Sequence, residues 1–463
     1  MSSSIYGTLN TTLDSLQAQM AGIDTVTNNI ANVNTPGYSR QVATLQEAEP
    51  SAPGQTASGV SVQSIQSIQD NVLELQLTQE NQTQAGLTSY VNAGQQAQGQ
   101  FNDSAGSGIS SSLSGFFSSL QQLSTNPTDT PTRQSVLLAA QNLSQVFNST
   151  ASSLSNQQAG LDSSVASTVT QVNTLTSQIA TINTSIQEAQ GGSSSENTTG
   201  ALTDQRTELI RQLSSLIGVS VVNTGNGGVT VETPSGSPLV VGNSSVNLTS
   251  AVNVSTGHQE VFSQGQDITS SITGGSLGGT LQARGLITGL QTNLDQLASG
   301  IANAVNTQNQ AGTDMNGAAG GNIFVAPPAN GVGAAGSLAV AITDPSKIAA
   351  SSDGTTGSNG NITAMAALAN QNIVNGQPPA SAYTSLVSGL GSAISNATSE
   401  QTASNLNLQQ LQAQRDSISG VNLDEESAML IQFQRAYQAA TQVATVINTL
   451  TGDALNLGVS TTV

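Results

Sequence analysis

Cysteine and tryptophan are absent from this chain of 463 residues, and aromatic side chains make up only 3% of it. Without cysteine the chain can form no disulfide bond, no thiolate metal site and no cysteine nucleophile. Hydrophobic residues still account for 36% of the chain, which is enough to form cores at this length. With so few aromatic rings, we expect thin cores distributed over more than one domain.

Charge is scarce as well. Charged residues are 8% of the chain, against ~25% in an average soluble protein, and serine, threonine, asparagine and glutamine take their place. A neutral polar surface can be buried against another subunit without removing water from ions, a step that costs several kcal/mol for an unpaired charge. The composition therefore suits a subunit of a polymer, although a general habit of exported proteins would also produce it.

Positive charge is the scarcest of all. Lysine and arginine total 8 and the acids total 27, which gives a formal charge of −19. Nucleic acids and acidic membranes attract basic patches, so we expect no binding to either. The chain does not begin with a basic segment and an apolar core, and no run approaches the ~20 apolar residues of a membrane span. We expect neither a signal peptide nor membrane insertion, so any export would need a different route.

Few groups in the sequence could carry out chemistry. His258 is the only histidine and stands in a polar, loop-like context, so any serine-type triad would have to run through it. Asp424, Glu425 and Glu426 could act as acid and base carboxylates, but their place in the first turn of a predicted helix already explains them. We predict that none of these residues is catalytic.

Two loops resemble ligand-binding motifs only loosely. The glycine-rich stretch from Gly274 to Gly279 lacks the lysine of a phosphate loop, and we interpret it as a flexible turn. Asp314, Asn316 and Gly317 match part of a calcium loop but lack its terminal glutamate. We predict no metal site and no cofactor.

The strongest pattern in the chain is a long helix predicted from Asn422 to Leu450. Asn422 can cap it, Glu425 stands where a capping box places an acid, and Gly452 marks its end. From Leu430 onward its apolar residues alternate between steps of three and four, as in a coiled-coil seam. The seam consists of Leu430, Phe433, Tyr437, Ala440, Ala444 and Ile447, and a second row of Met429, Ala436, Val443, Val446 and Leu450 runs beside it.

A matching seam lies at the other end, in a helix predicted from Ile5 to Val33. At about 1.5 Å per residue each helix would be ~42 Å long, so the two could pair along their length. The seams could simply be core within one subunit. However, residues of middling helix propensity are common in both helices, and the double row leaves apolar surface over after pairing. We predict that both seams and Leu450 form the interface to neighbouring subunits, the N-terminal seam being Leu9, Leu13, Leu16, Met20, Ile23 and Ile30.

Between the ends, helical periodicity dominates. A short strand is predicted from Gly59 to Ile65, and from about residue 219 to residue 283 the period changes from helical to two. We predict a mixed, mainly α fold in three parts, with the β segment at the tip of the molecule. These parts are a terminal coiled-coil domain (1–45 plus 418–463), a mainly helical, bundle-like middle domain with small β elements (46–218 plus 284–417) and an inserted small β domain (219–283).

One short segment points to a family. From Asn28 to Arg40 the sequence reads Asn-Asn-Ile-Ala-Asn-Val-Asn-Thr-Pro-Gly-Tyr-Ser-Arg, where the proline stops the helix and the glycine supplies any left-handed conformation needed. It resembles the N-terminal signature of the flagellar axial proteins, the family of rod, hook and hook-associated subunits. The residues of this signature turn are Asn29, Asn32, Asn34, Pro36, Gly37 and Tyr38.

Further matches narrow the resemblance to the hook-associated proteins of the first kind, which join hook and filament. They are the continuation through Gln41, a helix opening at Asp204, the glycine-rich stretch after Thr273 and the run from Ala311 to Phe324. The resemblance covers most of the chain. Within the same class, a hook or distal rod protein is the alternative; from another class, a secreted coiled-coil adhesin or hydrolase.

The resemblance implies a structural subunit without enzymatic activity or cofactor. It implies secretion through the flagellar type III export channel and a place outside the cell, at the junction of hook and filament. Copies of the chain would form a ring, with the terminal helices lining the inner tube and the β domain facing outward. The implied partners are the hook protein, the second junction protein and, before export, a cytoplasmic FlgN-type chaperone bound to the C-terminal helix.

Overall fold

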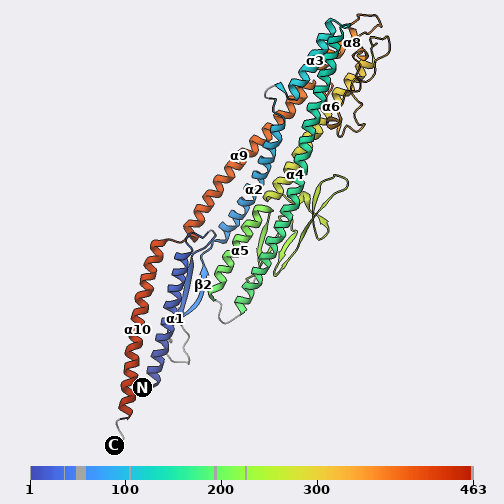
Figure 1. Ribbon diagram of the computed structural model, residues 1–463. Helices are drawn as coiled ribbons and strands as arrows, with labels where there is room; N and C mark the ends of the chain where they lie inside the picture. The colour runs from blue at the N-terminus through green and yellow to red at the C-terminus, as the bar shows by residue number, and fades with distance from the viewer. Residues whose placement is uncertain are drawn as a thin grey trace.

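The computed structural model describes residues 2–35, 37–47, 59–103, 106–191, 196–224 and 227–459. The molecule is long and narrow, and it is built mainly from long helices that run along its axis (Figure 1). The α-helices are α1 (Ser2–Ala31), α2 (Asn71–Gln100), α3 (Ile109–Thr125), α4 (Thr130–Gly191), α5 (Glu196–Leu216), α6 (Gly275–Gln310), α7 (Ala334–Ser337), α8 (Gly360–Ala367), α9 (Pro379–Ser419) and α10 (Leu423–Val459).

Within the described residues the strands form three small antiparallel sheets. These are a hairpin of β1 (Gln41–Glu47) and β2 (Val60–Ser67), a sheet of β3 (Ser220–Asn223), β4 (Val229–Glu232), β5 (Pro238–Val241) and β6 (Ser244–Ser245), and a sheet of β7 (Leu248–Val252), β8 (Gln259–Ser263) and β9 (Gln266–Asp267). The mainly α fold with small β elements is therefore confirmed.

Helices α1 and α10 form one end of the molecule, where they lie side by side and antiparallel (Figure 1). They meet where the ring of Phe433 covers Gly22: a β-carbon on that glycine would lie 2.7 Å from the ring. The predicted end of the C-terminal helix at Gly452 is wrong. Gly452 keeps a helical backbone, at a cost of ~1 kcal/mol relative to alanine, and α10 continues through it.

The β1–β2 hairpin connects this pair to the rest of the molecule, and β2 packs against α1 and α5. The pattern predicts β2 but misses β1. The reason is that its apolar residues Val42 and Leu45 stand three positions apart in the sequence, which breaks the alternation expected of a strand.

The shaft of the molecule is centred on α2, which packs against α6 and α9. Asp70 caps α2 by accepting the backbone N–H groups of Val72 and Leu73. On α6, Gly279 lies directly against the backbone carbonyl of Gly86, so a side chain at this crossing has no space. The interpretation of the glycine-rich stretch as a flexible turn is therefore wrong, because its glycines allow two helices to pack closely.

Helix α4 spans 62 residues and packs against α3, α5 and α6. Near the far end of the molecule, Phe116, Phe147 and Phe324 are fully buried in a large apolar core. Helix α5 begins at Glu196, so Asp204 lies inside a helix and does not open one, contrary to expectation.

The two sheets between residues 220 and 267 pack against α4 and α5 and form a second core with them. Val231, Leu239 and Val261 of the sheets are buried there together with Val172 and Leu213 of the helices. The predicted position of the β segment at the tip is wrong. It lies along the side of the shaft, and α3 and α8 occupy the far end (Figure 1).

The three-part division of the chain by residue number remains a prediction. The second core contains residues of both the predicted helical part and the predicted β part, so the core does not mark a border between them. Over the described ranges, we find no helix with the length and apolar character that crossing a membrane requires.

Candidate assembly site on the terminal helices

The side of α1 that faces α10 is made of small residues. Ala18, Gly22 and Thr25 are buried there, at steps of four and three. Small residues let two helix backbones approach closely, and the Phe433 ring of α10 fills the space above the glycine.

The predicted seam of α1 lies mainly on the other side of that helix. Leu13 and Met20 remain 46% and 56% exposed, and the other seam residues, Leu9, Leu16, Ile23 and Ile30, are only partly buried. The expected pairing of seam with seam is therefore wrong for α1. A row of leucine and methionine would hold the bulky Phe433 too far away, so α1 presents its small residues to α10.

On α10 the predicted seam does lie toward α1. Ile447 is buried, and Leu430, Phe433, Tyr437, Ala440 and Ala444 are partly buried. The second row is largely left in solvent: Val443, Val446 and Leu450 are 48%, 58% and 56% exposed. The terminal pair thus displays an outer row of α1 (Leu9, Leu13, Leu16 and Met20) and an outer row of α10 (Ala439, Val443, Val446 and Leu450).

The signature turn closes on the fully buried side chain of Asn29. Its Oδ1 atom accepts the Tyr38 hydroxyl at 2.8 Å and the Gln41 backbone N–H at 2.9 Å. Its Nδ2 atom donates to the Gln41 carbonyl at 2.8 Å and to Glu426 Oε2 at 2.9 Å. One asparagine therefore joins the end of α1, the start of β1 and the start of α10. Burial, with the nearby Asp204 and Glu426 carboxylates, raises the pKa of Tyr38 to about 12.

Arg40 makes the second connection to α10. Its Nε donates to Glu426 Oε1 at 2.8 Å, and its Nη1 lies 3.2 Å from Glu425 Oε2. Its backbone N–H donates to the Ser419 carbonyl at the end of α9. Two of the acids once considered as catalytic carboxylates thus fix the position of a helix, while Asn422 Oδ1 caps that helix by accepting the Asp424 N–H.

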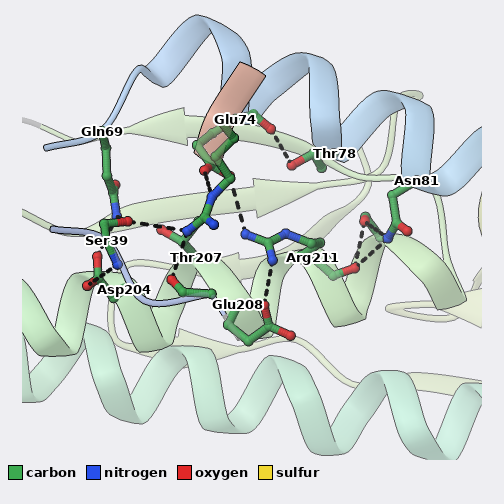
Figure 2. A network of polar contacts seen from close by, with 12 residues as sticks. Ser39, Gln69, Glu74, Thr78, Asn81, Asp204, Thr207, Glu208 and Arg211 are labelled. Carbon is green, nitrogen blue, oxygen red and sulfur yellow. Dashed lines mark hydrogen bonds and ion pairs between the residues drawn. The ribbon is translucent and has the colours of Figure 1, made fainter. Parts of the chain in front are cut away.

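On the shaft side, Ser39 is held by Asp204 of α5 (Figure 2). The Ser39 backbone N–H donates to Asp204 Oδ2 at 3.2 Å, and the Gln69 amide donates to Asp204 Oδ1 at 2.6 Å. Burial raises the pKa of Asp204, and the hydrogen bonds it accepts oppose that rise.

Two further arginines complete the network. Arg415 of α9 pairs with Glu74 of α2 at 2.9 Å and donates to the Gly37 carbonyl at 2.9 Å. Arg211 of α5 lies between Glu208 at 2.7 Å and Glu74 at 3.5 Å, and Figure 2 shows these three side chains turned toward one another. The chain thus places three of its eight basic residues at the joint between the terminal pair and the shaft.

The remaining signature residues have smaller roles. Gly37 adopts φ +80°, which confirms its predicted left-handed conformation. Asn32 donates to the Asn28 carbonyl, Asn34 is exposed, and Pro36 lies outside the described residues.

The other candidate groups are used to hold the fold together. His258 lies 3.2 Å from Asp162 of α4, which also pairs with Arg284 of α6 at 2.9 Å, so this group fastens the β7–β8 turn to the shaft. Asp314 accepts two backbone N–H groups of its own turn and pairs with Lys347. In the part of the chain that the structure describes, no three histidines or acids are grouped as metal ligands.

Sequence reasoning found the signature turn but missed its partners Glu74, Asp204, Arg211 and Arg415. The one feature of the sequence that points to these partners is the small number of basic residues. Where a chain has only eight basic residues, each arginine is a candidate for an ion pair, but the sequence does not say with which acid.

Comparison with known proteins places these features in context. Residues 94–324 match the family described as flagellar hook-associated protein FlgK helical domain. Residues 9–38 match the flagella basal body rod protein family, and residues 412–457 match the flagellar basal body rod FlgEFG protein C-terminal family.

Full-length similarity points the same way. The chain is 30% identical to flagellar hook-associated protein 1 of Bacillus subtilis, over 98% of this chain and 99% of that protein. It is 27% identical to flagellar hook-associated protein 1 of Escherichia coli, over 97% of this chain and 99% of that protein. The structure of the flagellar hook junction protein FlgK from Burkholderia pseudomallei superposes with a TM-score of 0.67 at 20% identity, covering 74% of this chain and all of that one, which shows a shared fold.

Proposed function

This chain belongs to the family of flagellar hook-associated protein 1, and from that membership we propose that it is a structural subunit of the bacterial flagellum at the junction of hook and filament. Its relatives are structural proteins, and the residues once considered for catalysis hold helices and turns in place. Its site of action is the flagellum, and its partners are copies of itself and other axial proteins.

The observation that carries the proposal is the pair of outer rows on the terminal helices. Leu13, Met20, Val443, Val446 and Leu450 are all between 46% and 58% exposed. Long rows of exposed apolar side chains are rare on monomers and mark surfaces that meet other proteins. We assign direct subunit contact to the outer rows.

The other predicted interface residues act indirectly. Leu430, Phe433, Tyr437, Ala440, Ala444 and Ile447 hold α10 on α1, and Ile23 and Ile30 border the same contact. The signature turn then fixes this pair on the shaft.

We propose more specific partners from the family membership, and the exposed rows are compatible with them. The exposed apolar outer rows would have to be shielded from solvent before assembly, and a cytoplasmic FlgN-type chaperone bound to α10 would do this. After export through the flagellar type III channel, the chain would meet the hook protein on one side and the second junction protein on the other, outside the cell. In the ring, the terminal pair would line the inner tube and the sheets on the shaft would face outward.

The experiment replaces apolar residues of the outer row and compares filament attachment. Leu13→Gln with Met20→Gln should abolish attachment of filaments to hooks. The control is Leu138→Gln on α4, where the leucine is 55% exposed and belongs to neither outer row; it should leave attachment unchanged. Normal attachment with the double variant would contradict the proposal.

A further inference from the structure

The two terminal helices have a defined register within one chain. Gly22 lies against Phe433, and Asn29 bonds to Glu426. In both pairs the residue numbers add up to 455. Because the helices are antiparallel, any two residues whose numbers add up to 455 lie at the same height along the pair.

The outer rows match each other in a second register. Leu9, Leu13, Leu16 and Met20 follow one another at steps of four, three and four, and the outer row of α10 has the same steps in reverse. When the two rows are aligned antiparallel, the residue numbers of each facing pair add up to 459. These pairs are Leu9 with Leu450, Leu13 with Val446, Leu16 with Val443 and Met20 with Ala439.

The next position in this register pairs opposite charges. Asp24 follows Met20 by four residues, Arg435 precedes Ala439 by four, and their numbers also add up to 459. Both side chains are exposed, and neither has an ion pair among the described residues. Each of the other seven basic residues bonds to a carboxylate or a backbone carbonyl within the chain.

These two residues cannot meet within one chain. Asp24 stands two positions after Gly22, and Arg435 two positions after Phe433. At 3.6 residues per turn, each therefore lies ~160° round its helix from the contact between α1 and α10. They occupy opposite outer sides of the pair.

We infer that the outer row of α1 in one copy packs on the outer row of α10 in the next copy, with an Asp24–Arg435 ion pair across the contact. The occupant of each outer row is thus a second copy of this chain. The inference rests on the proposed assembly through the terminal helices, and it adds the register and the partner of each residue.

The register also fixes the geometry of the array. A sum of 459 in place of 455 shifts neighbouring copies along the axis by four residues, about 6 Å or roughly one helical turn. The contact joins two different surfaces, so it repeats head to tail and does not close as a two-fold dimer. The outer row of α10 lies ~120° round from the side that faces α1, so successive copies turn as well as shift, and the proposed ring would be a turn of a helix and not a flat, closed ring.

An exchange of charges tests the ion pair. Asp24→Arg and Arg435→Asp should each weaken assembly on hooks by at least ~10-fold, because each places like charges together. The double variant should recover most of the loss. The control Glu400→Arg with Arg435→Asp has the same net charge but changes an exposed acid on α9, so it should recover nothing. Unaltered helix content and melting temperature would show that the monomers fold.

Cross-linking tests the register. Because the chain has no native cysteine, only the introduced cysteines can form disulfide bonds. Leu13→Cys with Val446→Cys should give a ladder of disulfide-linked oligomers on oxidation of assembled protein. Met20→Cys with Val446→Cys, displaced by about 10 Å in this register, should give none. A disulfide formed within one chain, or oligomer ladders of equal intensity from both cysteine variants, would overturn the inference. So would an Asp24→Arg, Arg435→Asp double variant that assembles no better than the single variants. A wild-type chain that does not assemble on hooks would instead contradict the proposed function.

Discussion

Asn29 shows how one side chain can fix a turn and two helices. It accepts two hydrogen bonds and donates two, which satisfies the full capacity of its amide. An aspartate would place a second carboxylate against Glu426. An apolar residue would leave the buried N–H and carbonyl of Gln41 unpaired, at a cost of about 1–3 kcal/mol for each group. The geometry explains why an asparagine stands at this place in the signature.

Arg40 offers a test of burial, because it pairs with two adjacent glutamates. Glu426 is fully buried and Glu425 keeps 58% of its side chain exposed. Glu426→Ala should destabilise the terminal pair by ~3 kcal/mol, since it leaves Arg40 and Asn29 without their buried partner. Glu425→Ala should cost less than ~1 kcal/mol. Amide hydrogen exchange of α1 and α10 measures both, and equal effects would contradict the assigned burial.

Tyr38 provides a pH signature of the same turn. Its pKa in the folded chain is about 12, above the ordinary value of ~10, because burial disfavours the phenolate. The stability that it contributes is therefore complete below pH ~10 and is lost as the pH rises through about 12. The difference in unfolding free energy between wild type and Tyr38→Phe should stay constant up to pH ~10 and then shrink. A decrease that begins near neutral pH would show that the hydroxyl is not buried as described.

At the level of elements, periodicity revealed the helices and their apolar rows but not which row faces which partner. Leu13 and Met20 form the more apolar side of α1, and an amphipathic helix usually buries that side in its own chain. Here Gly22 gives closer contact with Phe433, and Ala18 is buried one turn away, so the less apolar side is buried. The sequence of one helix cannot reveal this choice, because it depends on the shape of the other helix.

The glycines of α6 show the same limit. Three of them are indistinguishable in sequence, yet Gly279 packs against the Gly86 backbone while Gly285 and Gly289 have open space around them. A glycine-rich segment suggests flexibility when it is read alone. The crossing of α2 and α6 turns it into a point of close packing.

Alanine substitutions distinguish these glycines. Gly279→Ala should destabilise the protein by ~1–3 kcal/mol, because its methyl group meets the Gly86 carbonyl. Gly285→Ala should stabilise it by up to ~1 kcal/mol through helix propensity alone. Denaturant unfolding of both variants measures the difference, and a stabilising Gly279→Ala would mean that the two helices do not cross this closely.

For the whole molecule, the joint between the terminal pair and the shaft depends on contacts between distant parts of the chain. Arg415 reaches Gly37, and Glu426 reaches Arg40. Sequence patterns describe local periodicity, so the positions of the helices along the chain could be predicted. The pairings between distant residues and the position of the sheets along the shaft could not. The joint holds the outer rows at a fixed orientation to the shaft, as the proposed contact between copies requires.

The central claim is that the terminal helices carry subunit assembly. Hydrogen exchange of the full-length chain, free and assembled on isolated hooks, tests it most directly. We predict that peptides from α1 and α10 gain protection on assembly by far more than peptides from the exposed face of α4. Protection gained mainly along α4 or the sheets, with α1 and α10 unchanged, would contradict the account.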